Sequence, residues 1–172
     1  MSGLIRMFGI DPGLNRCGWG VVEADGPRLR YLAHGVVKPP SQDPLSERLR
    51  NLYEGLRAAM SGFELSHAAV EATFVNTQHG NHASALLLGH ARGAAMLACA
   101  TNGLSVDEIA ATEVKKALVG TGKAEKEQVA LMVRRLLPAA SEVTADAADA
   151  LAVAITASHR AQSFLTRAKV RA

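Results

Sequence analysis

The stretch MFGIDPG, residues 7–13, places one carboxylate, Asp11, at the end of a short apolar segment. The apolar residues before Asp11 are typical of a core strand. The Pro12-Gly13 pair ends that strand, because proline lacks an amide donor and glycine tolerates turn dihedrals. Asp11 is therefore expected at the edge of a sheet, between protein and solvent. Taken alone, it is more simply explained as a turn cap than as a catalytic group, and a catalytic role requires other acids that converge on it.

The segments that follow predict an α/β fold built on a five-stranded mixed sheet. The β-rich runs and the Gly and Pro turns after the first strand indicate a three-stranded antiparallel meander. A short apolar run, HAAVEA, comes after a helix and is typical of a parallel strand, and it ends at Glu71 much as the first strand ends at Asp11. The expected strands are 7–11, 17–24, 28–38, 67–72 and 104–109.

Helical spacing and helix start and stop signals predict five helices around this sheet. They are expected at 45–60, 82–100, 112–119, 126–137 and 145–162. The segment 82–100 is apolar almost all the way round, so we expect one side to pack on the sheet and the other to meet a second element or a second subunit. Residues 1–163 are expected to form one domain, and residues 164–172 a basic, disordered C-terminal tail.

The last helix brings two further acids, Asp146 and Asp149, onto one face. Residues three apart on a helix project about 60 degrees from each other. The alanines around them would let the helix lie close to the sheet, within reach of Asp11 and Glu71. The alternative is that both acids only favour the positive end of the helix dipole, which explains Asp146 better than Asp149. Four carboxylates without basic partners would repel each other unless cations bind, and hard oxygen donors favour magnesium or manganese.

Composition narrows the class of protein without identifying it. The 172 residues are 48% hydrophobic, which fits one globular domain, and we expect neither a membrane span nor a secretory signal, hence a cytoplasmic protein. The net charge of +3 is compatible with nucleic acid but too small to establish it. Cys17 and Cys99 have no metal-ligand spacing and are expected to be reduced core residues.

An ordered set of motifs resembles the RuvC family of Holliday junction resolvases. The motifs are GIDPG at 9–13, VEATF at 70–74, LGHARG at 88–93, VKKALVGTGKAEKEQV at 114–129 and DAADALAVAI at 146–155. The resemblance implies a ribonuclease H-like fold and a homodimer. It also implies paired symmetric nicks in four-way junction DNA, in recombination and repair, by two-metal-ion phosphodiester hydrolysis with Mg²⁺ or Mn²⁺. The implied partners are the branch-migration proteins RuvA and RuvB.

The resemblance also assigns roles to individual residues. It implies that the four acids, Asp11, Glu71, Asp146 and Asp149, are the catalytic metal ligands. It implies DNA contacts for Phe74, Lys115 and Lys126. A lysine on an amphipathic helix is otherwise usually solvated, and an aromatic residue in a loop usually anchors that loop to the core.

One loop and the overall function each have alternative interpretations. The loop NTQHGNH at 76–82 carries His79 and His82, for which a polar DNA contact or a plain surface loop is favoured over a metal site. A non-catalytic junction-binding scaffold is one alternative function, although all four acids are present. A phosphotransferase of the actin and sugar-kinase superfold is another, although that fold needs two such domains and a second phosphate loop.

Overall fold

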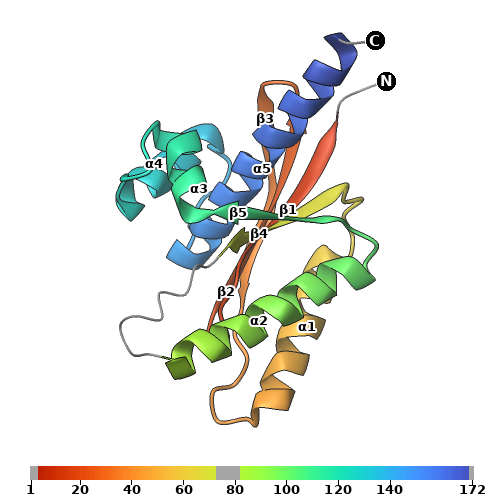
Figure 1. Ribbon diagram of the computed structural model, residues 1–172, viewed down its shortest axis with the longest axis vertical. Coiled ribbons are helices and arrows are strands. Elements are labelled where there is room, and N and C mark those ends of the chain that lie inside the picture. Colours follow the sequence, from red (N-terminus) through yellow and green to blue (C-terminus); the bar gives the residue numbers. More distant parts are fainter. Residues whose placement is uncertain (1–3, 73–81, 171–172) are drawn as a thin grey trace.

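A computed structural model describes residues 4–72 and 82–170 and shows one mixed sheet between two layers of helices (Figure 1). The strand order is β3-β2-β1-β4-β5, so the first strand is central. Strand β1 pairs antiparallel with β2 and parallel with β4; β2 pairs antiparallel with β3, and β4 pairs parallel with β5. The strands are β1 (Ile5–Asp11), β2 (Cys17–Asp25), β3 (Arg28–Val37), β4 (His67–Ala72) and β5 (Val106–Ala110). The predicted five-stranded sheet is confirmed.

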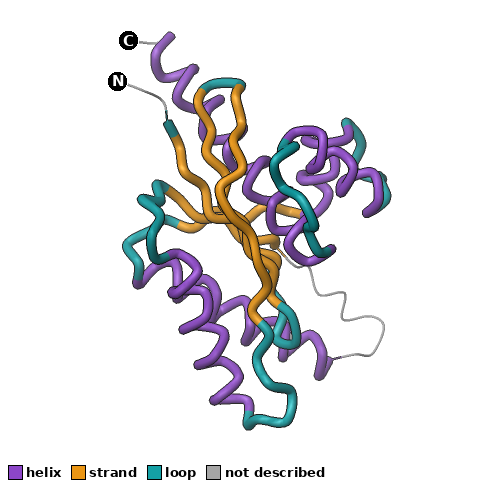
Figure 2. The backbone as a smooth tube through the Cα atoms, turned by 180° about the vertical axis from the view of Figure 1, so that it is seen from behind, coloured by secondary structure: helices purple, strands orange, loops and turns teal. Residues whose placement is uncertain are grey.

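Five helices cover the two faces of the sheet (Figure 2). One face carries α5 with α3 and α4 beside it, and the opposite face carries α1 and α2. The helices are α1 (Leu45–Met60), α2 (His82–Thr101), α3 (Ala111–Val119), α4 (Lys126–Leu136) and α5 (Ala145–Val170). Thr144 accepts a hydrogen bond from the amide of Ala147 and so caps α5.

Alternation along β1 divides the core between these layers. Met7 belongs to the apolar cluster under α5, whereas Phe8 and Ile10 belong to the cluster under α1 and α2. This is the two-residue period of a strand that is buried on both faces. Helix α5 is buried between Ala147 and Ala157 except at Asp149, so it is the central helix of the molecule.

One expectation from the sequence differs from the structure. Helix α5 continues to Val170, across the domain boundary expected at residue 163. Helix α2 has the length and composition of a helix that could cross a membrane, with a mean hydropathy of 1.3, and the absence of a membrane span stays a prediction. Because α2 mixes leucine with alanine and glycine, it contains no long uninterrupted apolar run. Helices that pack within a fold meet the same criterion, and α2 packs against α1.

Candidate active site

Asp11 and Glu71 lie side by side at the carboxyl ends of two neighbouring parallel strands. The register pairs Ile10 of β1 with Val70 of β4, so the next residue of each strand is an acid. By strand alternation, Asp11 shares the α5 side of the sheet with Met7, and Glu71 shares it with Ala69. The two carboxylates therefore face the helix that carries Asp146 and Asp149, as the sequence predicted.

Glycines in β1 and β2 let α5 approach the sheet closely. A Cβ added at Gly18 would lie 2.0 Å from the carbonyl oxygen of Asp146, and one at Gly9 would lie 2.3 Å from that of Ala150. Contacts this short leave no space for any side chain. The alanines of α5 alone were expected to allow the close approach, and the matching glycines of the sheet were not predicted.

Three of the four acids line one cavity of about 210 Å³. Asp11, Glu71 and Asp149 contribute to its wall, together with Lys115 of α3 and Lys126 of α4. The structure therefore brings together five of the seven residues that the resemblance selected. Asp146 is not part of this wall, although it lies on the same helix one turn before Asp149.

Crowding of the acids changes their proton affinity. Burial, followed by the charges of Glu71 and Asp149, raises the pKa of Asp11 to about 7. Burial also raises the pKa of Glu71, and the charge of Asp149 acts in the same direction. Lys126 opposes the shift at both carboxyls. Burial is the main cause of both shifts, and the mutual repulsion of the carboxylates adds to it.

Lys126 is ion-paired within the site. It is the first residue of α4, and its Nζ donates to Oδ2 of Asp149 over 3.3 Å. The charge of Asp149 raises the pKa of Lys126, which therefore stays protonated. A capping box between Glu125 and Gln128 fixes the start of α4 and so the place from which Lys126 reaches the acids.

Arg16 is a site residue that the sequence analysis missed. Its Nε donates to Oδ2 of Asp146 over 2.6 Å, from the loop between β1 and β2. With Lys126 on Asp149, two of the four acids thus have basic partners, so the expectation of a cluster without such partners was wrong. No spacing signal links Arg16 to an acid 130 residues away, because the pair exists only once α5 packs on the sheet.

The donor set fits a hard divalent cation. The four acids offer carboxylate oxygens, and a cation would offset the repulsion that Glu71 and Asp149 exert on the half-buried Asp11. Within residues 4–72 and 82–170, however, no group of three or more His, Cys, Asp or Glu side chains is already positioned to hold a metal ion. A metal ion would therefore have to draw the carboxylates together, and at Asp146 and Asp149 it would compete with the positive charges of Arg16 and Lys126.

Two of the remaining predicted residues lie outside the residues that the structure describes. Phe74 and His79 belong to residues 73–81, so the structure does not test their predicted roles. His82 is described as the exposed first residue of α2.

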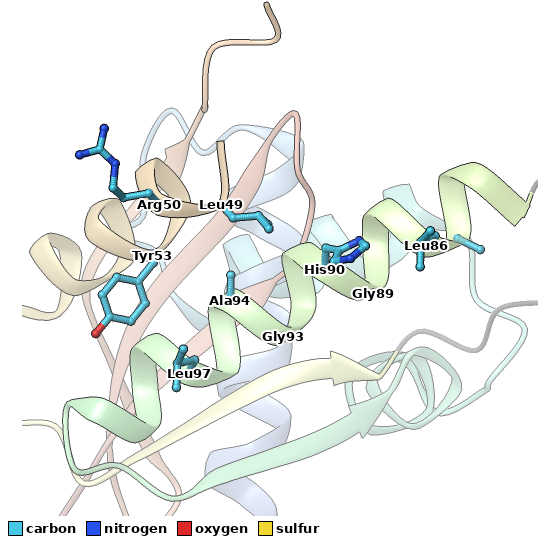
Figure 3. A pocket seen from close by; sticks show the side chains of 10 residues that line it. Leu49, Arg50, Tyr53, Leu86, Gly89, His90, Gly93, Ala94 and Leu97 are labelled. Atoms are coloured by element: carbon cyan, nitrogen blue, oxygen red, sulfur yellow. The ribbon is translucent and has the colours of Figure 1, made fainter. Parts of the chain in front are cut away.

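A larger hollow of about 720 Å³ lies away from the acids, between α1 and α2 (Figure 3). Leu49, Arg50 and Tyr53 of α1 face Leu86, Gly89, His90, Gly93, Ala94 and Leu97 of α2. No acid is among the described residues that line it, so it offers none of the chemistry of the smaller cavity. Its exposed leucines make it a candidate for protein contact instead.

Comparison with protein families gives one consistent result. The family model described as crossover junction endodeoxyribonuclease RuvC matches residues 7–157. The RuvC protein of Bradyrhizobium diazoefficiens is 53% identical over 170 residues, which cover 99% of this chain and 95% of that protein. The RuvC protein of Azorhizobium caulinodans is 52% identical over 168 residues, covering 97% and 98%, respectively.

Comparison with solved structures also gives RuvC. Thermus thermophilus RuvC in complex with Holliday junction substrate superposes with a TM-score of 0.83 at 35% sequence identity. The match covers 92% of this chain and 96% of the Thermus chain. The predicted ribonuclease H-like architecture is confirmed by this similarity and by the strand order.

Proposed function

This chain belongs to the RuvC family of crossover junction endodeoxyribonucleases, and on that premise we propose that its four acids form the hydrolytic centre. It is a nuclease that resolves four-way DNA junctions. The observation that carries the proposal is the convergence of Asp11, Glu71 and Asp149 on one cavity from two strand ends and one helix. Asp146, one helical turn away, completes the proposed set.

We propose that Asp11, Glu71, Asp146 and Asp149 together hold two Mg²⁺ ions, for which Mn²⁺ can substitute. Support comes from their hard oxygen donors and from the raised pKa values of Asp11 and Glu71. When bound, such ions supply Lewis-acid stabilisation of the charge that develops on the phosphate during in-line hydrolysis. Asp11 is the proposed shared ligand, because it lies on the central strand and its pKa responds to all three other acids.

The two lysines are proposed to position the DNA backbone. Lys115 and Lys126 come from separate helices and line the same wall as the acids. The Lys126 side chain is 80% exposed, so its ammonium can turn from Asp149 to a phosphate oxygen without being buried. Phe74 is proposed to stack on a base near the crossover; this role rests on the family resemblance alone.

A homodimer is proposed because a two-fold symmetric junction needs two active sites for two symmetric cuts. The hollow between α1 and α2 is the surface proposed for the contact between subunits. Leu86 and Leu97 are 64% and 56% exposed there, and cover by a second copy would remove them from water. RuvA and RuvB are proposed as further partners from the family resemblance, and the cytoplasm as the place of action because the substrate is junction DNA.

The test is nicking of a synthetic four-way junction by the full chain in Mg²⁺. We expect symmetric cuts that leave 5′-phosphate ends, no cuts in EDTA, and no cuts in a linear duplex of the same sequence. Asp11→Asn is expected to abolish nicking and to leave junction binding intact. Asp25→Asn, the same change at the exposed end of β2, is the matched control and should cut normally.

Two results would count against the proposal. Failure of the wild type to cut any branched DNA with Mg²⁺ or Mn²⁺ would leave a junction-binding scaffold as the better description. Full activity of Asp11→Asn would remove that carboxylate from the chemistry.

A further inference from the structure

Asp146 stands apart from the other three acids in its surroundings. It does not line the cavity. Its charge raises the pKa of Asp11 less than the charges of Glu71 and Asp149 do. Its carboxylate is held instead by Arg16, with 2.6 Å between Nε and Oδ2. The side chains of Arg16 and Asp146 are 47% and 28% exposed, so the pair lies at the rim of the site.

The loop that carries Arg16 is held in place from two directions. Arg48 of α1 donates to Oδ1 of Asn15 over 2.5 Å and to the carbonyl of Leu14 over 3.3 Å. Within the loop, a Cβ on Gly13 would lie 2.3 Å from the carbonyl oxygen of Arg16, so the backbone folds back on itself there. These contacts hold the backbone on either side of Arg16, and so they determine where its side chain meets Asp146.

The guanidinium and a divalent cation would compete for the same carboxylate. Nε of Arg16 occupies only Oδ2 of Asp146, so Oδ1 stays open to a cation, but the positive charge of the guanidinium beside the carboxylate opposes a second cation there. Lys126 has a similar relation to Asp149, but it reaches from an 80% exposed side chain and belongs to the cavity wall. Within the described part of the chain, the ion pair of Arg16 is with Asp146, the fourth acid.

We propose that Arg16 is a positioning residue that holds Asp146 at the rim of the site and weakens metal binding there until the ion pair is broken. This inference rests on the metal site of the proposed function. In this role Arg16 lowers the affinity of Asp146 for a divalent cation. An ion pair at half-exposed positions shifts such an equilibrium about two- to fivefold.

The test measures Mn²⁺ binding to the full chain, without DNA, by titration calorimetry. We expect Arg16→Gln to tighten Mn²⁺ binding about two- to fivefold. In an Asp146→Asn background, the same Arg16→Gln change should have no effect, because the carboxylate in dispute is absent. Arg16→Lys keeps the positive charge and should restore most of the wild-type affinity.

A charge control separates the ion pair from the general field. Arg160→Gln removes the same charge from an arginine that pairs with Glu113 and lies about 21 Å along α5 from Asp146. Its Mn²⁺ affinity should equal that of the wild type. Thermal unfolding of each variant checks that the fold is kept, which the exposed position of Arg16 favours.

The outcomes distinguish this inference from the proposed function. Equal or weaker Mn²⁺ binding by Arg16→Gln, with wild-type binding intact, would overturn the role of Arg16 alone. Tighter binding that persists in the Asp146→Asn background would do the same, because the effect would not pass through Asp146. No Mn²⁺ binding by the wild type would refute the metal site and this inference with it.

Discussion

Gly18 and Asp146 are in direct backbone contact: a Cβ on Gly18 would lie 2.0 Å from the carbonyl oxygen of Asp146. The contact joins β2 to the first turn of α5, the helix that carries Asp146 and Asp149. The position of the acids therefore depends on a residue that has no side chain.

Gly18→Ala is expected to push the start of α5 away from the sheet and to lower both stability and activity. Overpacking of this kind typically reduces the free energy of unfolding by about 1–3 kcal/mol. Thermal unfolding and junction nicking are the measurements. Gly122→Ala is the control, since its new Cβ would meet its nearest neighbour at 3.4 Å. Equal nicking by Gly18→Ala and the wild type would show that the site tolerates a shifted helix.

The raised pKa of Asp11 predicts that stability falls with rising pH in EDTA. Folded Asp11 keeps its proton up to about pH 7, whereas the unfolded chain releases it at the ordinary aspartate pKa of 3.8. Between these values the folded state binds more protons, so the free energy of unfolding declines by at most about 1.4 kcal/mol per pH unit and then levels off above pH 7. Asp11→Asn should flatten this decline in thermal unfolding between pH 5 and 8.

The same variant is expected to be more stable than the wild type at pH 8 in EDTA, although it cannot nick. Glu71, whose pKa is also raised, leaves a smaller slope of the same sign in Asp11→Asn. A pH dependence identical in the two proteins would mean that the crowding of Asp11 has no energetic effect.

Lys126→Gln should raise the pKa of Asp11 further and slow nicking. Lys126 lowers the pKa of both Asp11 and Glu71, so its removal leaves their repulsion less compensated. Carbon NMR of the Asp11 carboxyl in EDTA reports the first effect. Loss of a charge-assisted contact to phosphate should reduce the nicking rate about 10- to 100-fold. Lys123→Gln, at an exposed position nearby, is the matched control. An unchanged pKa of Asp11 in this variant would show that the charge of Lys126 does not act on Asp11.

Leu97→Glu is expected to separate the proposed dimer. The substitution places a charge in the hollow between α1 and α2, where Leu97 is 56% exposed. Sedimentation velocity should show monomers, and paired nicking should give way to single nicks. Leu131→Glu on α4, where the leucine is 44% exposed, makes the same change outside that surface and should stay dimeric. A dimer that persists in Leu97→Glu would place the subunit contact elsewhere.

The sequence was sufficient to predict the sheet and the acids. Strand ends marked by Asp11 and Glu71 and a helix face marked by Asp149 are local patterns, and the fold aligns them at one edge. Arg16 was not predictable in this way, since its partner lies far along the chain and the pair depends on loop geometry. The end of α5 was missed for a different reason. Residues after Gln162 lack Gly and Pro, so their composition permits the helix to continue, but no stop signal marks where it ends.

The central place of β1 has a consequence for the protein during its synthesis. Strand β1 is synthesised well before α5, which supplies Asp146 and Asp149. A nascent or prematurely terminated chain that ends before α5 lacks half of the proposed acids and the helix that covers the β1 and β2 face. The proposed cutting centre is therefore complete only once α5 has been synthesised, so a fragment that ends before α5 is expected to lack nicking activity.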